Sequence, residues 1–570
     1  MNARQLLALG LGVSVLCGTA RAEAAGLYFS DRGVRPMGRA GAFIAGADDA
    51  GAIWYNPAGL ADTPTSFLAD FTWLRLTSEY KRQLLIRDAS DTLQRVDSAT
   101  VEGSTPVLPL PTLIGNYHLK EPNLSIAAGF YAPYVALAGY PETVNGQPSP
   151  ARYTLGSFNA SRVVLMGGWV GWAPTDWLRI GGGVQALMGT VRSTIAFSVS
   201  LEDRLLGAPE QPEYDALSQF EIGPFIAPSG NAGLILIPHD SVRIGVSAQT
   251  PTVIDSDAKI RVRLPSSVIF DEASVDGEDA HVKVKLAGIV RAGIEVRPMD
   301  PLRVEAAFVR EVWSAHDKIE ATPKNMAIIN LPGGPQRITL PSIDIPRNFQ
   351  DSDSYRLGAE YQLPIDDYRL VTRAGVAYET SAVPDPYLSL SSLDFDKVLV
   401  TLGGSLYVGD HWRFDALYAH VFTREVYVDP ASAKVGRINP VKGNAPFEPV
   451  NGGTYSASAD LIGFGLQYSF DAPAKPNKTA KPRLRPKPDA EPNTAPLPPT
   501  SEEGADDVED LDDERFRGVK PADVDLDDAG KDKPATRKPA GKKPETKKPS
   551  SKKPLDPKFR GVKPEDVDLD

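Results

Sequence analysis

Residues Ile462–Phe470 read I-G-F-G-L-Q-Y-S-F, so that large apolar side chains alternate with small or polar ones. This period of two predicts a β-strand with one apolar face and one small or polar face. The same alternation occurs in Tyr355–Tyr361 (YRLGAEY) and Leu302–Phe308 (LRVEAAF). A soluble β-sandwich would bury the apolar face in its core, whereas an outer-membrane barrel would turn it towards lipid. Alternation alone leaves both folds open.

The links between the strands separate these two folds. Alternation predicts fourteen strands, at residues 66–80, 112–119, 124–135, 160–173, 177–199, 218–237, 242–265, 280–297, 302–318, 353–363, 368–381, 397–408, 412–428 and 454–470. Six of the links are tight (KEPN, PTD, PHDS, PMDP, PIDD and GDH), and the links that alternate with them are long. Short turns at one rim and long loops at the other are typical of an outer-membrane barrel. Trp172, Trp177, Tyr368 and Trp412 lie close to tight turns, where an aromatic girdle is expected.

The N-terminus reads as a secretory signal. Arg4 supplies a basic start, Leu6–Cys17 forms a short apolar run, and small residues follow, with cleavage expected after Ala22 or Ala24. Cleavage would remove Cys17, the only cysteine of the chain, and leave no thiol chemistry. We therefore predict a signal peptide at 1–24, a barrel at 63–470 and a location in the outer membrane of a Gram-negative bacterium.

The segment 25–62 differs from the strands because it lacks alternation and is rich in small residues. It is long enough to fold into the barrel as a lumenal hatch. Its Gly/Ala-rich run Gly38–Gly51, with the acidic pair Asp48-Asp49, is followed by Tyr55–Gly59 (YNPAG). Further along the chain are Gly129–Tyr134 (GFYAPY) and Ala151–Tyr153 (ARY). On these motifs, and on a closing strand that ends at Phe470, the chain resembles the FadL/TodX family of outer-membrane transporters.

The resemblance implies a function as well as a fold. That family has an all-β, 14-stranded antiparallel transmembrane β-barrel with an N-terminal hatch. It carries long-chain fatty acids or other hydrophobic small molecules by capture at extracellular loops, passage into the barrel and lateral exit to lipid near a kinked third strand. Carried over to this chain, the hatch turn is Asn56, Pro57, Ala58 and Gly59. Asparagine and proline are both typical of tight turns.

The other two sites lie in and after the third strand. Gly129 and Pro133 are the residue types that weaken or interrupt a strand ladder, so the lateral opening is expected near them. The apolar loop 136–141, with Leu137 and Tyr140, is the expected capture surface for substrate. Gly181–Gly183 lies within a strand and is interpreted as a thin part of the lumenal face. Pairing of Asp48 and Asp49 with lumenal arginines and plain solvation of these charges are both open.

Residues 471–570 depart from the family pattern. This segment holds 17 of the 50 prolines and almost no aromatic residues, so we predict a disordered periplasmic tail. Within it, Phe516–Asp527 (FRGVKPADVDLD) and Phe559–Asp570 (FRGVKPEDVDLD) differ at one position. They are either a duplication in low-complexity sequence or a motif presented twice to a periplasmic partner, since two tethered copies raise avidity.

Composition excludes several other functions. The net charge of −12 argues against nucleic-acid binding. The six histidines, at 118, 239, 281, 316, 411 and 420, lack metal-site spacing, and no phosphate loop or nucleophile elbow is found. We expect no enzyme activity, cofactor or metal, and a monomer surrounded by outer-membrane lipid. Two alternatives stay open: a general aqueous porin, or a barrel anchor whose tail binds a periplasmic partner.

Overall fold

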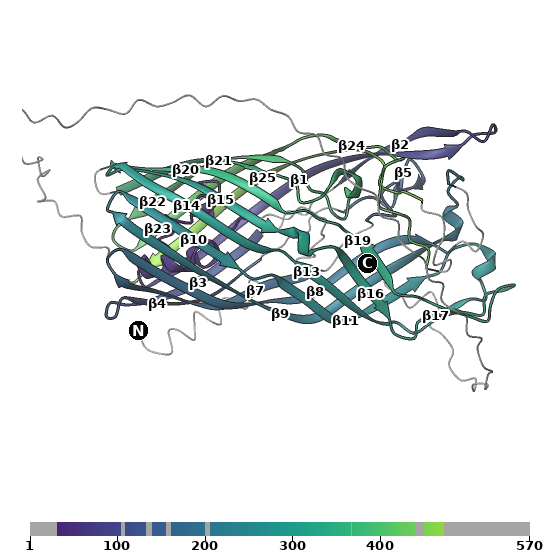
Figure 1. The fold of residues 1–570 in the computed structure, drawn as a ribbon, viewed down its shortest axis with the longest axis horizontal. Helices are drawn as coiled ribbons and strands as arrows, with labels where there is room; N and C mark the ends of the chain where they lie inside the picture. Colours follow the sequence, from purple (N-terminus) through teal and green to yellow (C-terminus); the bar gives the residue numbers. More distant parts are fainter. Residues whose placement is uncertain are drawn as a thin grey trace, which may run out of the picture. The chain divides into compact units, whose positions relative to one another are not determined.

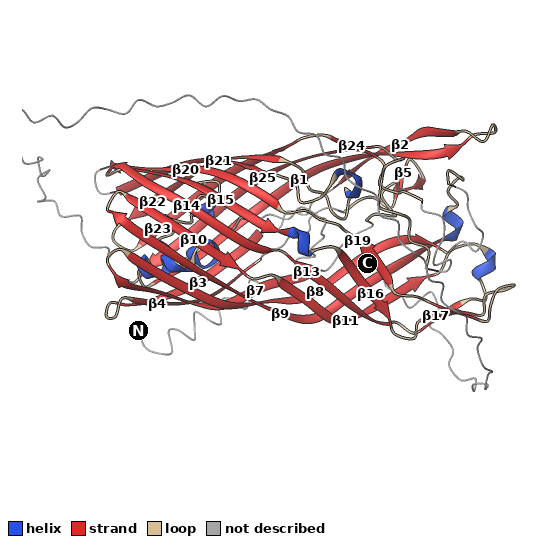
Figure 2. Ribbon diagram, viewed as in Figure 1, coloured by secondary structure: helices blue, strands red, loops and turns tan. Residues whose placement is uncertain are grey.

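The computed structural model describes residues 31–103, 109–132, 139–155, 161–199, 206–365, 368–440 and 448–471. The predicted signal peptide and both tail repeats lie outside these residues. The described chain is a closed, antiparallel, 14-stranded barrel with few and short helices (Figures 1 and 2). Its first strand, β1, pairs with β3 on one side and with the last strand, β25, on the other, which closes the wall. The predicted fold class is confirmed.

Eight positions in the wall are single strands. They are β1 (Ser66–Arg87), β4 (Leu124–Tyr131), β7 (Arg162–Thr175), β8 (Leu178–Ser198), β9 (Asp215–His239), β21 (Tyr368–Glu379), β22 (Lys397–Val408) and β25 (Gly453–Ser469). Six positions are interrupted and hold two strands in succession. These are β2 (Leu93–Gly103) with β3 (Pro109–Leu119), β10 (Val242–Gln249) with β11 (Thr252–Arg263), β13 (Asp279–Leu286) with β14 (Gly288–Met299), β15 (Leu302–Val312) with β16 (Lys318–Pro323), β19 (Ile343–Pro346) with β20 (Ser352–Ile365), and β23 (Trp412–Thr423) with β24 (Val426–Val428).

The longest strand that the sequence did not predict lies in the first long link. β2 (Leu93–Gly103) pairs with the far part of β1 inside the segment that was predicted as a long loop. Most of its residues are exposed. Most of β2 is exposed on both faces, and so the contact with lipid that produces alternation is absent.

The outer face of the barrel is apolar where the sequence predicted it. On β25, Ile462, Phe464 and Leu466 are exposed, while Gly463 and Gly465 face inward beside Val34 and Asp70. The four aromatic residues predicted for the girdle are all exposed. Within the described residues, no helix is long and apolar enough to cross a membrane.

The long links fold over the end of the barrel opposite the tight turns. They contain β5 (Thr143–Val144), β6 (Gln147–Pro148), β12 (Ser274–Asp276), β17 (Ala327–Ile329), β18 (Arg337–Thr339) and the short 3-10 helices η2 (Pro212–Tyr214), η3 (Val268–Phe270), η4 (Trp313–Ala315) and η5 (Asp385–Tyr387). Buried loop residues such as Phe270 and Met326 pack against Ile260 and Val282 of β11 and β13. Apolar loop side chains therefore line this end of the barrel.

Candidate functional site: the hatch and the lumen above it

The hatch lies inside the barrel and is almost completely buried. It contains α2 (Val34–Met37), α3 (Ala52–Tyr55) and η1 (Pro57–Asp62). From Asp31 to Ala61, every residue except Asp48 is buried. The small residues that set this segment apart in the sequence allow its backbone to approach the barrel wall closely.

The hatch turn is held by the Asn56 side chain. Its Oδ1 accepts a hydrogen bond from the N–H of Ala58 at 3.2 Å. Its Nδ2 donates to the carbonyl oxygen of Ile44 at 2.9 Å and to that of Leu234, on β9, at 3.2 Å. Pro57 follows as the first residue of η1, where a missing N–H costs little. One amide therefore joins the turn, the rest of the hatch and the wall.

Glycines in the wall make room for this turn. A Cβ on Gly181 of β8 would lie 2.3 Å from the nitrogen of Ala58, and one on Gly233 of β9 would lie 2.0 Å from Oδ1 of Asn56. Within the hatch, a Cβ on Gly59 would lie 2.3 Å from the carbonyl oxygen of Ala47. No real Cβ tolerates such distances. The interpretation of Gly181–Gly183 as a thin lumenal face holds for Gly181, which contacts the hatch, and for Gly183, which lies against Trp169.

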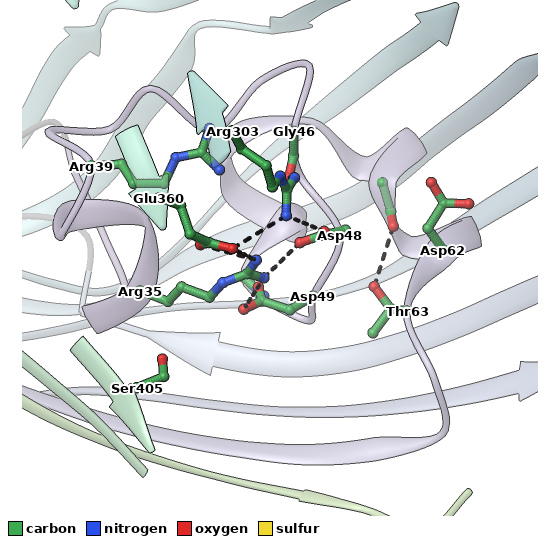
Figure 3. Close-up of polar contacts among 12 residues, drawn as sticks. Arg35, Arg39, Gly46, Asp48, Asp49, Asp62, Thr63, Arg303, Glu360 and Ser405 are labelled. Carbon is green, nitrogen blue, oxygen red and sulfur yellow. Dashed lines mark hydrogen bonds and ion pairs between the residues drawn. The ribbon is translucent and has the colours of Figure 1, made fainter. Parts of the chain in front are cut away.

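The acidic pair of the hatch is bound by arginines (Figure 3). Asp48 accepts from Arg35, also in the hatch, at 2.6 Å and from Arg303 of β15 at 2.7 Å. Asp49 accepts from Arg35 at 3.1 Å and from Arg413 of β23 at 3.0 Å. Of the two alternatives left open by the sequence, pairing with lumenal arginines is the one observed.

A second buried cluster lies beside the first. Arg39 of the hatch contacts Glu295 of β14 and Glu305 of β15, both at 3.1 Å. The Glu305 carboxylate also accepts from the backbone N–H groups of Ile44, Ala45 and Gly46 at 2.6, 3.0 and 2.9 Å. Glu305 thus neutralises an arginine and satisfies three backbone donors that have no partner in a helix or strand.

Both ends of the hatch are also attached to the wall. Asp31 forms an ion pair with Arg356 of β20, and Asp62 pairs with Arg243 of β10 and, at 2.7 Å, with Arg179 of β8. Removing one partner of a buried ion pair costs about 3–5 kcal/mol, because the other charge stays buried. The hatch is therefore fixed to strands around the whole barrel, and its packed side chains fill the lumen at this level.

An apolar region lies on the hatch. We call it the apolar lumen cluster, and it consists of Phe43, Ile53, Trp54, Ile114, Tyr131, Leu165, Trp169, Leu187, Phe225, Ala227, Ile254, Ile289 and Val309. Trp54 meets the ring of Tyr131 edge-on, with centroids 5.4 Å apart. The polar tips of two aromatics are satisfied, since the Tyr131 hydroxyl donates to Gln185 at 3.0 Å and Trp169 Nε1 donates to Asn231 at 3.1 Å. Their apolar faces make this part of the lumen a suitable environment for hydrophobic molecules.

The lateral opening is predicted near Gly129 and Pro133, at the third strand, β4. In the structure Gly129 pairs with Ile114 of β3 and with Gly167 of β7, so the ladder is continuous at this residue. Glycine keeps its N–H and C=O groups and loses only side-chain packing. The paired part of β4 ends at Tyr131, and Pro133 lies outside the described residues.

The expected capture loop is described only in part. Leu137 lies outside the described residues. Tyr140 is 7% exposed, and its hydroxyl lies 2.9 Å from Oγ of Ser78 on β1. Its ring packs inside the barrel and offers no exposed surface, which differs from the sequence expectation. The loop was judged by its apolar composition, and the structure uses that composition for packing.

A pocket at the loop end of the barrel escaped the sequence reasoning. Its apolar lining includes Leu84, Ile86, Leu206 and Val450, and its charged lining is Arg82, Glu210, Arg437 and Glu448. Burial acts to raise the pKa of Glu210, but the neighbouring guanidinium groups of Arg82 and Arg152 lower it to about 2. These residues come from four separate segments, so no local pattern announces the pocket. Among the described residues, no group of three or more His, Cys, Asp or Glu side chains is placed to hold a metal ion.

Comparisons with known proteins agree with this architecture. The family described as "Outer membrane protein transport protein (OMPP1/FadL/TodX)" matches residues 15–470. A FadL homologue of Pseudomonas aeruginosa has a similar structure, with a TM-score of 0.60 and 14% identity over 78% of this chain and 100% of its own. The toluene transporter TbuX of Ralstonia pickettii gives a TM-score of 0.49 and 15% identity over 78% of this chain and 99% of its own. No protein with a curated function matches the sequence. Because the family match spans the hatch and all fourteen strands, the chain belongs to the OMPP1/FadL/TodX family of Gram-negative outer-membrane transport proteins.

Proposed function

We propose that this protein carries long-chain fatty acids or similar hydrophobic small molecules passively across the outer membrane. The observation that carries the proposal is the apolar lumen cluster, which lies directly on a hatch fixed by buried ion pairs. An aqueous porin needs a polar, open lumen, whereas this arrangement gives an apolar solute a favourable environment and blocks the way straight through. Transport of hydrophobic compounds is also what the family does.

The proposed route has three steps. Apolar molecules are captured at the loop end, where the pocket of Leu84, Ile86 and Leu206 provides apolar surface beside charged side chains. They then move to the apolar lumen cluster. Because the hatch blocks the axial path, they leave sideways into lipid, and we place this exit just beyond Tyr131, where the described pairing of β4 ends, near Gly129 and Pro133.

Uptake of radiolabelled oleate tests this function. The protein would be expressed in a Gram-negative host that lacks its own outer-membrane fatty-acid transporter, with empty vector as the control. We expect saturable uptake above the control, and its absence for both oleate and toluene would contradict the proposal. Swelling of proteoliposomes with small sugars addresses the porin alternative, because a barrel blocked by its hatch gives little swelling.

The tail supports a second candidate role that is compatible with transport. Two nearly identical twelve-residue segments, at 516–527 and 559–570, are present in one chain. We propose that they bind one periplasmic partner with raised avidity. Binding of a peptide with both copies, compared with peptides carrying one copy or a scrambled copy, would test this role against chance duplication.

A further inference from the structure

The barrel wall contains a place where two neighbouring strands are not joined. Below it, β10 and β9 pair up to Gln249 and Asn231, and the N–H of Thr250 still donates to the carbonyl oxygen of Gly230 at 2.9 Å. Pairing with β9 resumes only at Ala258 of β11. Between these points, in a part of the wall that is described without a gap, residues 223–229 and 251–257 form no register pair with each other. We call these two segments the β9–β11 seam.

Each side of the seam is paired to its other neighbour. β9 pairs with β8 from Ser229 with Gln185 to Phe225 with Gly189, and the register then shifts across Gly223-Pro224. β11 pairs with β13 from Thr252 onwards. The seam is therefore a discontinuity between two intact parts of the wall.

The cause lies in the side-chain phase of the two strands. Continuing the register of Gln249 and Asn231 would place Ile254 opposite Ile226. Directly opposed residues in a ladder point to the same face. Here Ile254 is 8% exposed and points inward, while Ile226 is 72% exposed and points outward. The alternation of inward and outward side chains reverses at Thr250-Pro251, just before β11, but in β9 it reverses only at Gly223-Pro224. Between those points, residues opposed in this register point to opposite faces of the wall. The effect is that of a one-residue slip, which moves every side chain to the wrong face.

Prolines reinforce the separation. The backbone groups of Gly230 point to the side of β10 and β11, because its carbonyl oxygen accepts from Thr250 in the link between these strands. Pro228 lies two residues further along and therefore faces β11 as well, without an N–H to offer. An unpaired backbone group in lipid costs several kcal/mol, so the absence of one N–H donor lowers the free-energy cost of leaving the seam unpaired.

The seam joins two apolar environments. On the inside it is lined by Phe225, Ala227 and Ile254, all members of the apolar lumen cluster. On the outside are the exposed side chains of Ile226 and Val253. The next outward positions of the seam on β11, Asp255 and Asp257, are charged, so the apolar part of the seam ends at Val253, at the outer edge of the apolar band and the level of the outer leaflet.

We propose that the β9–β11 seam is a second lateral passage, through which slim apolar molecules move between the lumen and the outer leaflet. The proposal rests on the transport function proposed above. No register pair between β9 and β11 has to separate, and opening displaces the side chains of the seam, of which Ala227, Ser229 and Ser256 are small. A passage here lies three wall positions away from β4 and is independent of it.

Cysteine bridges provide the test, because Cys17 in the predicted signal peptide is the only native cysteine. I226C with V253C spans the seam, and A132C with V164C closes the proposed exit beside β4. L234C with V246C, outward-facing register partners on β9 and β10 below the seam, is the matched control. Membrane-permeable bifunctional thiol reagents of increasing length would be used on cells until mass spectrometry shows complete bridging.

The decisive measurement is oleate uptake by the full-length protein whose β4 exit is already bridged. We expect residual uptake that falls to the vector level when the seam is also bridged and persists with the control bridge. If the β4 bridge alone abolishes uptake, or if residual uptake survives the seam bridge, the second passage is wrong. Failure of the proposed function gives a different result, because the unbridged protein would then show no uptake above vector.

Discussion

At the scale of single residues, Asn56 shows how one side chain holds a lumenal turn. It satisfies the N–H of Ala58 and the carbonyl oxygens of Ile44 and Leu234. In N56A these groups lose a buried partner, which costs about 1–3 kcal/mol for each group left unsatisfied. We expect oleate uptake to fall while the barrel still assembles, as judged by heat-modifiable gel mobility. Normal uptake by a heat-modifiable N56A barrel would contradict this prediction.

Gly181 and Gly182 form a natural matched pair on β8. A Cβ on Gly181 would collide with the backbone of the hatch turn at 2.3 Å, whereas one on Gly182 would lie 3.4 Å from its nearest neighbour, the Asn231 carbonyl oxygen. We expect G181V to displace the hatch and admit small sugars in the liposome-swelling assay. G182V, which faces outward, should swell no more than the native protein. Equal swelling of the two variants would show that the hatch turn does not depend on this contact.

The residue scale also shows a limit of sequence reasoning. Asparagine, proline and glycine at 56, 57 and 59 predict a turn from local chemistry, and a turn is found there. Tyr140 was placed by the apolar character of its loop, and it is buried against β1. Composition indicates that a side chain avoids water, but it does not indicate whether the substrate or another part of the protein buries it.

At the scale of elements, β15 carries two arginines in contrasting environments. Arg303 is buried and contacts Asp48 and Glu295, whereas Arg310 is half-exposed and pairs with Asp353. R303M leaves buried carboxylates without their partner and should destabilise the hatch by about 3–5 kcal/mol. R310M breaks an exposed pair that contributes about 0–1 kcal/mol. Amide exchange across residues 31–62 should accelerate in R303M and not in R310M, and equal exchange would contradict the argument.

The link before β9, residues 206–214, is predicted to become less stable at acidic pH. Glu210 has a pKa lowered to about 2 by Arg82 and Arg152, against an ordinary value of 4.5. A lowered pKa in the folded state stabilises the fold above the ordinary value, and this contribution is lost as pH falls from about 4.5 to about 2. Exchange protection of residues 206–214, corrected for intrinsic rates, should stay constant from pH 7 to pH 5 and then decline. E210Q should lack this decline, and an unchanged profile in E210Q would contradict the assignment.

The elements differ in how well alternation predicts them. Where a strand crosses the lipid band, alternation is obligatory, and all fourteen positions in the wall were predicted. The interruption between β10 and β11 was not predicted, because the change of phase at Thr250-Pro251 leaves both halves alternating and reads as one continuous strand. The partners of Asp48 and Asp49 could not be named either, since closure of the barrel brings Arg303 and Arg413 to them from distant parts of the chain.

At the scale of the whole molecule, the averages of composition conceal the architecture. Overall the chain is 42% hydrophobic, which is an ordinary value for a soluble protein. This whole-chain value combines a polar, proline-rich tail with a barrel that has an apolar face towards lipid and buried ion pairs around its hatch. A lipid-facing surface and buried charges therefore coexist in one sequence without a long apolar stretch in the barrel.

Deletion of residues 472–570 tests whether the tail takes part in transport. Barrel closure depends on β1 and β25, which pair from Ser66 with Ser469 to Arg82 with Gly453, and on the N–H of Phe470, which donates to the carbonyl oxygen of Thr65 at 2.8 Å. All of these residues remain in the shortened protein. We therefore expect unchanged heat-modifiable mobility and unchanged oleate uptake. A variant that lacks only Phe559–Asp570 is the control for effects of the terminal repeat itself. Loss of uptake in the longer deletion, with the barrel still assembled, would mean that the tail takes part in transport and would overturn its assignment to a separate periplasmic role.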